Sequence, residues 1–123
     1  VVTGDHSERF TFAIEQDVRT KSTIPCIFYG QGVEQSWFTN TSIGCHMQLA
    51  GTLAEIVGPA GFQYSALMPT MFAKDDFVFN HRLVARENDL EFVDKLQDKA
   101  TSDYIAAMRN VGAWRVLKGN GIL

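Results

Sequence analysis

The sequence predicts an α+β fold in which two helices pack on one face of an antiparallel sheet. Some segments alternate apolar and polar residues with a period of two, which is typical of half-buried strands. Two other segments place apolar residues three and four positions apart, as one face of a helix does. The chain has 123 residues, of which 46% are hydrophobic, and this size and composition predict a single domain over residues 1–123.

Two N-terminal segments predict a β-hairpin. Residues 9–18 place apolar side chains on one parity and polar side chains on the other, the pattern of a half-buried strand. Residues 24–29 are apolar on both faces and predict a more central strand. Pro25 lacks a backbone N–H, so we expect it near the start of that strand or at a sheet edge.

A strand and then a helix are predicted next. Residues 36–43 are rich in aromatic and β-branched side chains and favour a strand. Residues 45–57 contain no proline and carry a helical apolar stripe, and Gly58 and Pro59 follow as a stop signal. Gly51 inside this helix costs about 1 kcal/mol relative to alanine, so we expect it to mark a close contact.

The strongest strand pattern in the chain spans residues 77–86. Its alternation places Phe79, His81 and Leu83 on one face. A weaker alternation over residues 62–68 predicts another strand before it. These two segments supply two successive strands to the predicted order.

A long helix and a short strand complete the predicted order. Asn88 to Glu91 form an asparagine-capped helix start, and an apolar stripe continues to Val111. Gly112 ends this helix, and residues 113–117 predict a last strand. After the N-terminal hairpin the order is strand, helix, strand, strand, helix, strand, which is the split βαβ, ferredoxin-like arrangement. The hairpin would extend the sheet or cover its free face.

Charge and cysteine content narrow the class of protein. Eleven Lys and Arg against fourteen Asp and Glu give a net charge of −3, which argues against a nucleic-acid partner because phosphate binding needs clustered positive charge. No apolar run approaches the roughly 20 residues that cross a bilayer, so no membrane partner is expected. Cys26 and Cys45 predict free thiols and a cytoplasmic location. An exported or processed chain in which the two cysteines pair is the alternative.

No motif for a cofactor, a metal or a nucleophile stands out. The segment Gly30-Gln31-Gly32 lacks the third glycine of a dinucleotide-binding fingerprint and predicts a turn. The three histidines and two cysteines have none of the close spacings typical of zinc sites. No nucleophile elbow or cysteine-protease signature is present. We therefore expect no cofactor and no metal, and the sequence leaves open whether the protein is an enzyme.

His81 is the leading candidate for a functional side chain. Its predicted place among apolar residues favours a hydrogen-bonded core histidine. If that face instead lines a pocket, His81 becomes the first proton-transfer candidate, because an unperturbed imidazole titrates near neutral pH. Tyr64 and either Arg82 or Arg86 would then supply further polar groups, and Trp37 completes the predicted ligand-binding set.

The aromatic content exceeds what two helices on one sheet face obviously cover. The chain contains nine Phe, three Tyr and two Trp, so we predict a small non-catalytic binding or assembly domain that forms a homodimer through an aromatic sheet face. The alternative is a small-molecule-binding protein or enzyme that holds a small apolar ligand in an apolar pocket. A cavity of at least ~300 Å³ with His81 at its wall would favour this alternative.

Overall fold

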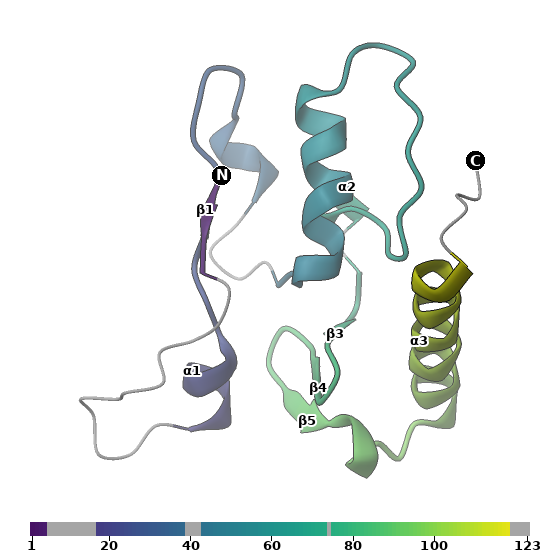
Figure 1. The fold of residues 1–123 in the computed structure, drawn as a ribbon. Coiled ribbons are helices and arrows are strands. Elements are labelled where there is room, and N and C mark those ends of the chain that lie inside the picture. The colour runs from purple at the N-terminus through teal and green to yellow at the C-terminus, as the bar shows by residue number, and fades with distance from the viewer. Residues whose placement is uncertain (5–16, 39–42, 74, 119–123) are drawn as a thin grey trace. The chain divides into compact units, whose positions relative to one another are not determined.

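The computed structural model describes residues 1–4, 17–38, 43–73 and 75–118. Contacts divide the chain into two units, Val1–Thr39 and Asn40–Leu123, each of which carries its own sheet. Figure 1 shows the helices and strands in chain order. The described residues form two antiparallel sheets and three α-helices, so the predicted α+β class is confirmed. A single domain over residues 1–123 stays a prediction.

The first unit contains a short antiparallel ladder. Strand β1, Val2–Thr3, pairs with strand β2, Cys26–Ile27. Pro25 immediately precedes β2, as its missing N–H predicts. The partner of β2 differs from that of the predicted hairpin, and residues 5–16, which carry most of the expected first strand, lie outside the described residues.

Helix α1, Val18–Ser22, begins at the end of the segment predicted as the first strand. Asp17 precedes it, and Asp17 Oδ1 accepts a hydrogen bond from the Thr20 N–H at 2.7 Å. This cap satisfies a backbone donor that the first helical turn leaves without an intrahelical partner. The backbone hydrogen bond from Thr20 also lowers the pKa of Asp17, because it stabilises the ionised carboxylate. Capping at Asp17 therefore overrides the alternating pattern at Val18.

A 3₁₀ turn, η1 at Gln35–Trp37, stands where the sequence predicts the start of a strand over residues 36–43. The Trp37 N–H donates to the carbonyl oxygen three residues earlier at 3.1 Å, which curls the backbone. Aromatic content is a weak strand signal here, because β preference mainly reflects packing against cross-strand neighbours. Residues 39–42 of the predicted strand lie outside the described residues.

The helix predicted over residues 45–57 is confirmed as α2, His46–Val57. At its start, Gln48 Oε1 accepts a hydrogen bond from the Cys45 N–H at 3.2 Å. At its end, the Gly58 N–H donates to a carbonyl of the last turn at 2.9 Å. The apolar period therefore predicted the start of this helix to within one residue, and the glycine stop signal predicted its end.

Residues 62–68, predicted as a strand, are irregular and lie against α2. The Tyr64 hydroxyl donates to Glu55 Oε1 at 2.7 Å, and the Thr70 hydroxyl donates to Glu55 Oε2 at 3.1 Å. A Cβ at Gly51 would lie 3.1 Å from the Tyr64 ring, so the predicted close contact is confirmed. The side chains of this segment therefore pack against helix α2, and its backbone does not pair in a sheet.

Strands β3 (Val78–Phe79), β4 (Leu83–Ala85) and β5 (Leu90–Phe92) form an antiparallel sheet in chain order. The split βαβ, ferredoxin-like strand order is therefore wrong. One predicted strand folds into the β3–β4 hairpin, and the start of the predicted long helix forms β5.

The predicted strand over residues 77–86 reverses direction at Asn80. The Asn80 N–H donates to the Leu83 carbonyl at 2.9 Å. Asn80 Oδ1 accepts hydrogen bonds from the Arg82 N–H at 2.8 Å and the Leu83 N–H at 2.9 Å. An asparagine side chain that binds backbone groups just ahead of it stabilises a turn. His81 is therefore exposed in this turn, and the prediction that it lies on an apolar strand face is wrong.

Helix α3, Lys99–Lys118, begins well after the predicted start at Asn88. Asp98 caps it: Asp98 Oδ1 accepts a hydrogen bond from the Ala100 N–H at 3.0 Å, and Oδ2 accepts one from the Thr101 hydroxyl at 2.6 Å. The Thr101 hydroxyl bond is the main reason that the pKa of Asp98 lies below its ordinary value of 3.8. The apolar residues of β5 fit a helical stripe as well as a strand, which explains the misplaced start.

The glycine predicted to end this helix lies inside it. Helix α3 continues past Gly112 through residues 113–117, where the sequence predicts a strand. One glycine costs a helix about 1 kcal/mol, and tertiary contacts offset this cost. A Cβ at Gly112 would lie 3.2 Å from Leu67 Cδ1, and Arg115 Nη2 donates to Ser65 Oγ at 2.9 Å.

The core of the second unit forms where both helices meet the sheet. Phe79 and its cross-strand neighbour Val84 are 3% and 1% exposed, and they share a cluster with Met68 and with Ile105 of α3. Cys45 at the start of α2 packs against the same cluster. The packing of two helices against an antiparallel sheet, which the sequence predicts, is therefore present in this unit.

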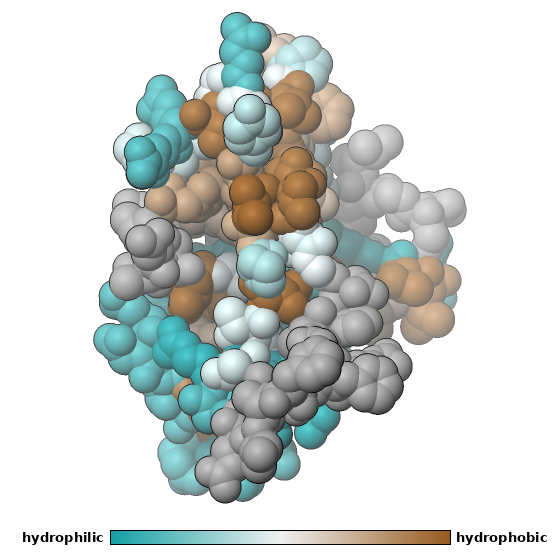
Figure 2. Space-filling model, turned by 90° about the vertical axis from the view of Figure 1, so that its left-hand side faces the viewer, coloured by the Kyte–Doolittle hydropathy of each residue, from teal (hydrophilic) through white to brown (hydrophobic). Residues whose placement is uncertain are grey.

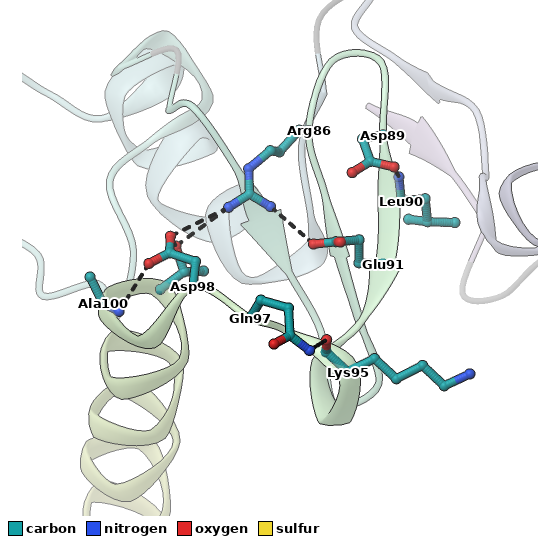
Figure 3. Close-up of polar contacts among 9 residues, drawn as sticks. Arg86, Asp89, Leu90, Glu91, Lys95, Gln97, Asp98 and Ala100 are labelled. Atoms are coloured by element: carbon teal, nitrogen blue, oxygen red, sulfur yellow. Dashed lines mark hydrogen bonds and ion pairs between the residues drawn. The ribbon is translucent and has the colours of Figure 1, made fainter.

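Arg86 links the sheet to the start of α3 (Figure 3). Its guanidinium nitrogens lie 3.8 Å from Glu91 Oε2 and 3.9 Å from Asp98 Oδ2, and Nη2 donates to Thr101 Oγ1 at 3.4 Å. The guanidinium also lies 5.6 Å from the centroid of the Phe77 ring. Arg86, which the sequence left open as a ligand-binding group, thus has structural partners in β5, just before β3 and at the start of α3.

The Asn80 turn can be tested by substitution. Asn80→Ala removes the acceptor for two backbone N–H groups, so we expect the free energy of unfolding to fall by about 1–2 kcal/mol. Asn80→Asp keeps an acceptor oxygen at the same place and should lose less. Urea denaturation of both variants measures the difference, and an Asn80→Ala protein as stable as the wild type would contradict the role of this side chain.

The Asp98 cap predicts a pH-dependent stability. The folded state lowers the pKa of Asp98 below 3.8, so its contribution is fully present above that pH and is lost as the pH falls through the folded-state pKa. Asp98→Ala should therefore destabilise the protein at pH 7, and the difference from wild type should shrink near pH 3. Asp98→Asn retains a capping oxygen without the charge, and its stability difference from Asp98→Ala should not depend on pH. Urea denaturation at the two pH values measures this, and an equal loss at both would contradict it.

Candidate functional site

An open depression of about 550 Å³ lies beside the β3–β4 turn. Residues from the turn, from β5, from the 3₁₀ turn η3 (Val93–Lys95) and from α3 surround it. Its lining residues are His81, Arg82, Phe92, Val93, Asp94, Lys95 and Arg109. Segments separated by up to 28 positions in the chain therefore meet around one space, since 109 − 81 = 28.

Hydrogen bonds hold the walls of this depression together. The Val93 N–H donates to the Arg82 carbonyl at 2.8 Å, which ties the turn to the end of β5. Arg109 Nη2 donates to the Asn80 carbonyl at 3.1 Å, which ties α3 to the same turn. The depression is thus framed by hydrogen-bonded elements, and such a frame limits the ordering that a ligand must impose on binding.

Positive charge is concentrated around the depression. Arg82, Lys95 and Arg109 contribute three cations against the single carboxylate of Asp94. Among the residues that the structure describes, none of these four groups forms an ion pair. Lys95 Nζ lies 5.5 Å from the centroid of the Phe92 ring, a cation–π arrangement at the wall of the depression.

The structure brings together two of the four predicted ligand-binding residues, His81 and Arg82. Tyr64 lies in the loop after α2, where its hydrogen bond to Glu55 raises the pKa of the phenol. Trp37 belongs to the unit Val1–Thr39 and is half-buried in η1. Neither Tyr64 nor Trp37 lines the depression, and their contact with a ligand stays a prediction.

Sequence reasoning missed Phe92, Lys95 and Arg109 as neighbours of His81. Position 95 falls inside the long helix that the sequence predicts from Asn88, and no spacing rule connects Arg109 to a turn nearly thirty residues earlier. The signal that could have identified the site is Asn80 followed by two polar residues inside an alternating segment, because asparagine is typical of turns.

A second depression of about 360 Å³ lies between the end of the loop before β3 and the start of α3. The Phe77 and Tyr104 rings at its wall pack edge to face with centroids 5.8 Å apart. Gln48, which is buried, donates to Asp75 Oδ2 at 3.0 Å. The aromatic rings and one carboxylate of this depression are therefore already engaged in packing and hydrogen bonding.

The thiols show little sign of nucleophilic chemistry. Cys26 and Cys45 are both free, as predicted. Burial raises the pKa of the Cys45 thiol, whose Sγ lies 3.6 Å from Met68 Sδ, so its thiolate form is disfavoured. Over residues 1–4, 17–38, 43–73 and 75–118, no group of three or more His, Cys, Asp and Glu side chains could hold a metal ion.

In the part of the chain that the structure describes, no helix combines the length and the apolar character needed to cross a membrane. The chain was compared with protein-family models, curated proteins and solved structures, and none of these comparisons gave a match.

Proposed function

We propose that this protein is a small, non-catalytic binding domain that holds a small molecule in the depression beside the β3–β4 turn. The observation that carries the proposal is the depression of about 550 Å³ with His81 and Arg82 at its wall. Small-molecule sites have volumes of roughly 300–1,000 Å³ and combine apolar surface with a few polar groups. Phe92 and Val93 supply the apolar surface, and the turn supplies the polar groups.

The frame of the depression supports binding by a largely preformed site. The Asn80 side chain fixes the turn, and two further hydrogen bonds connect the turn to β5 and to α3. A ligand would therefore contact groups whose backbone is already ordered, and less of the contact energy is lost to ordering.

The surroundings of His81 favour binding over proton-transfer catalysis. A catalytic base needs a nucleophile or a substrate proton within hydrogen-bond reach, and an orienting partner usually holds its second nitrogen. Among the described residues, no hydrogen bond joins His81 to a serine, a cysteine or a carboxylate. His81 is thus proposed as a contact residue.

Ligand binding can be tested with four probes that share a phenyl ring: phenyl phosphate, benzoate, benzyl alcohol and benzylamine. We expect at least one of them to shift the backbone amide signals of residues 81–82 and 92–95 saturably in ¹H–¹⁵N NMR spectra. His81→Ala combined with Arg82→Ala should abolish these shifts without unfolding the protein, because both side chains are exposed in the turn.

The control variant is Asn88→Ala, which changes an exposed residue in the β4–β5 turn and leaves the depression intact. It should bind the probes as the wild type does. The absence of saturable shifts with all four probes, or shifts that persist in the double variant, would refute the proposed site.

We further propose that the chain self-associates as a homodimer. Figure 2 shows a face on which apolar and polar side chains are interspersed; helix α3, drawn on the right of Figure 1, lies on the far side of this view. Val116 and Leu117 near the end of α3 are 83% and 81% exposed, and they lie beside the basic residues Arg115 and Lys118 of the last turn. Phe79 of the predicted aromatic sheet face is buried in the core. The C-terminal end of α3 is therefore the surface we propose for association, because burying such side chains is favourable.

Sedimentation velocity at high micromolar concentration tests self-association. The wild type should sediment as a dimer, and Val116→Asp should shift it to the monomer while the free energy of unfolding changes by less than about 0.5 kcal/mol. Ala107→Asp is the matched control, since position 107 lies nine residues earlier and on the opposite side of the helix. A monomeric wild type would refute the dimer.

The two free thiols support a reducing compartment, and we propose a cytoplasmic location on that basis. Cys26 lies on β2 with its thiol exposed to solvent. In an oxidising compartment this thiol would form disulfides with other thiols. A location with reduced glutathione avoids this reaction.

A further inference from the structure

The charge of the depression is opposite to that of the chain as a whole. The protein carries a net charge of −3. At the depression, three cations and one carboxylate give a local charge of +2, since 3 − 1 = 2, before the imidazole of His81 is counted. Three cations around one depression create a local positive potential there.

Two other cations of the second unit, Arg86 and Lys99, lie against carboxylates. Arg86 lies within 4 Å of both Glu91 and Asp98, and Lys99 Nζ lies 2.7 Å from Asp103 Oδ2. The cations of the depression differ, because none of them forms an ion pair among the described residues. The three cations that line the depression are therefore available to pair with an anion from outside the chain.

Each cation at the depression keeps hydrogen-bond donors available. A guanidinium carries five N–H donors, and Arg109 uses Nη2 for the Asn80 carbonyl, so other donors of Arg109 remain. Arg82 is held at its backbone by the Val93 N–H, which leaves its guanidinium to reach a ligand. The Lys95 ammonium lies over the Phe92 ring, so positive charge and apolar surface adjoin.

We infer that the ligand of this site is a small organic anion, a carboxylate or a phosphate monoester with an apolar body. This inference rests on the proposed binding function. Arg82 and Arg109 bind the anionic head, because the planar guanidinium matches the oxygens of both groups. Lys95 adds a third positive charge, and the apolar body lies on Phe92 and Val93. The Asp94 carboxylate disfavours a ligand with a second negative group close to it, because like charges repel.

The four phenyl probes distinguish this inference from the proposed function itself. We expect phenyl phosphate and benzoate to bind at least about tenfold more tightly than benzyl alcohol, the margin of one charge-assisted hydrogen bond. Benzylamine should not bind. Whichever anion binds more tightly identifies the head group as phosphate or carboxylate. Equal binding of benzyl alcohol and the anions would refute the anion preference and leave the binding site standing, whereas no binding of any probe would refute the site.

Substitutions locate the anion. Arg82→Ala should weaken binding of the anionic probes by about tenfold or more, and Arg82→Lys should restore only part of it because the lysine lacks the planar fork. Lys95→Ala should weaken the anions more than benzyl alcohol. Lys99→Ala is the matched control, because Lys99 is paired with Asp103 and does not line the depression. A loss with Lys99→Ala equal to that with Lys95→Ala would overturn the assignment in favour of a general charge effect.

Discussion

The hydrogen bonds of the Asn80 side chain are the interaction on which the second unit depends. By binding the N–H groups of Arg82 and Leu83, the Asn80 amide oxygen reverses the chain and fixes the register in which Phe79 lies opposite Val84. That register places both side chains in the core. The same reversal puts His81 and Arg82 at the surface, so core and site follow from one turn. A strand that continued through this point would have alternated His81 toward one sheet face instead.

The position of α3 decides whether this turn becomes the wall of a site. Asp98 caps the helix, and Arg86 connects that cap to β4 and β5. From this fixed start, Ile105 reaches the core, and Arg109 one turn later reaches the Asn80 carbonyl. Polar contacts therefore fix helix α3 at its start, through Asp98 and Arg86, and again at Arg109. Apolar packing alone would tolerate a shift along the helix axis, whereas these hydrogen bonds require particular atoms to meet.

The predictability of this fold follows from which signals are local. Helix α2 has a clear period and a glycine stop, and both lie within its own sequence. The β3–β4 hairpin was missed because the residues of its turn keep the parity of the flanking strands, so a period of two hides the reversal at Asn80. His81 and Arg82 were predicted as ligand-binding residues from a continuous strand, and the structure places both in a turn beside the depression instead. Lys95 and Arg109 could not be found in this way, because their nearness to the turn is created by tertiary contacts at Val93 and Asn80.

The two proposals for this protein meet on α3. Arg109 at the depression and Val116 at the proposed dimer surface are seven residues apart, which places them on the same side of the helix and about 10 Å apart along its axis. A second copy packed on Val116 would therefore border the depression and exclude water from part of it. Electrostatic contacts strengthen as water is excluded, so an anion bound by Arg109 would be held more tightly in the dimer. By linkage, the ligand would stabilise the dimer by the same factor, and binding and assembly would then be one coupled equilibrium rather than two separate functions.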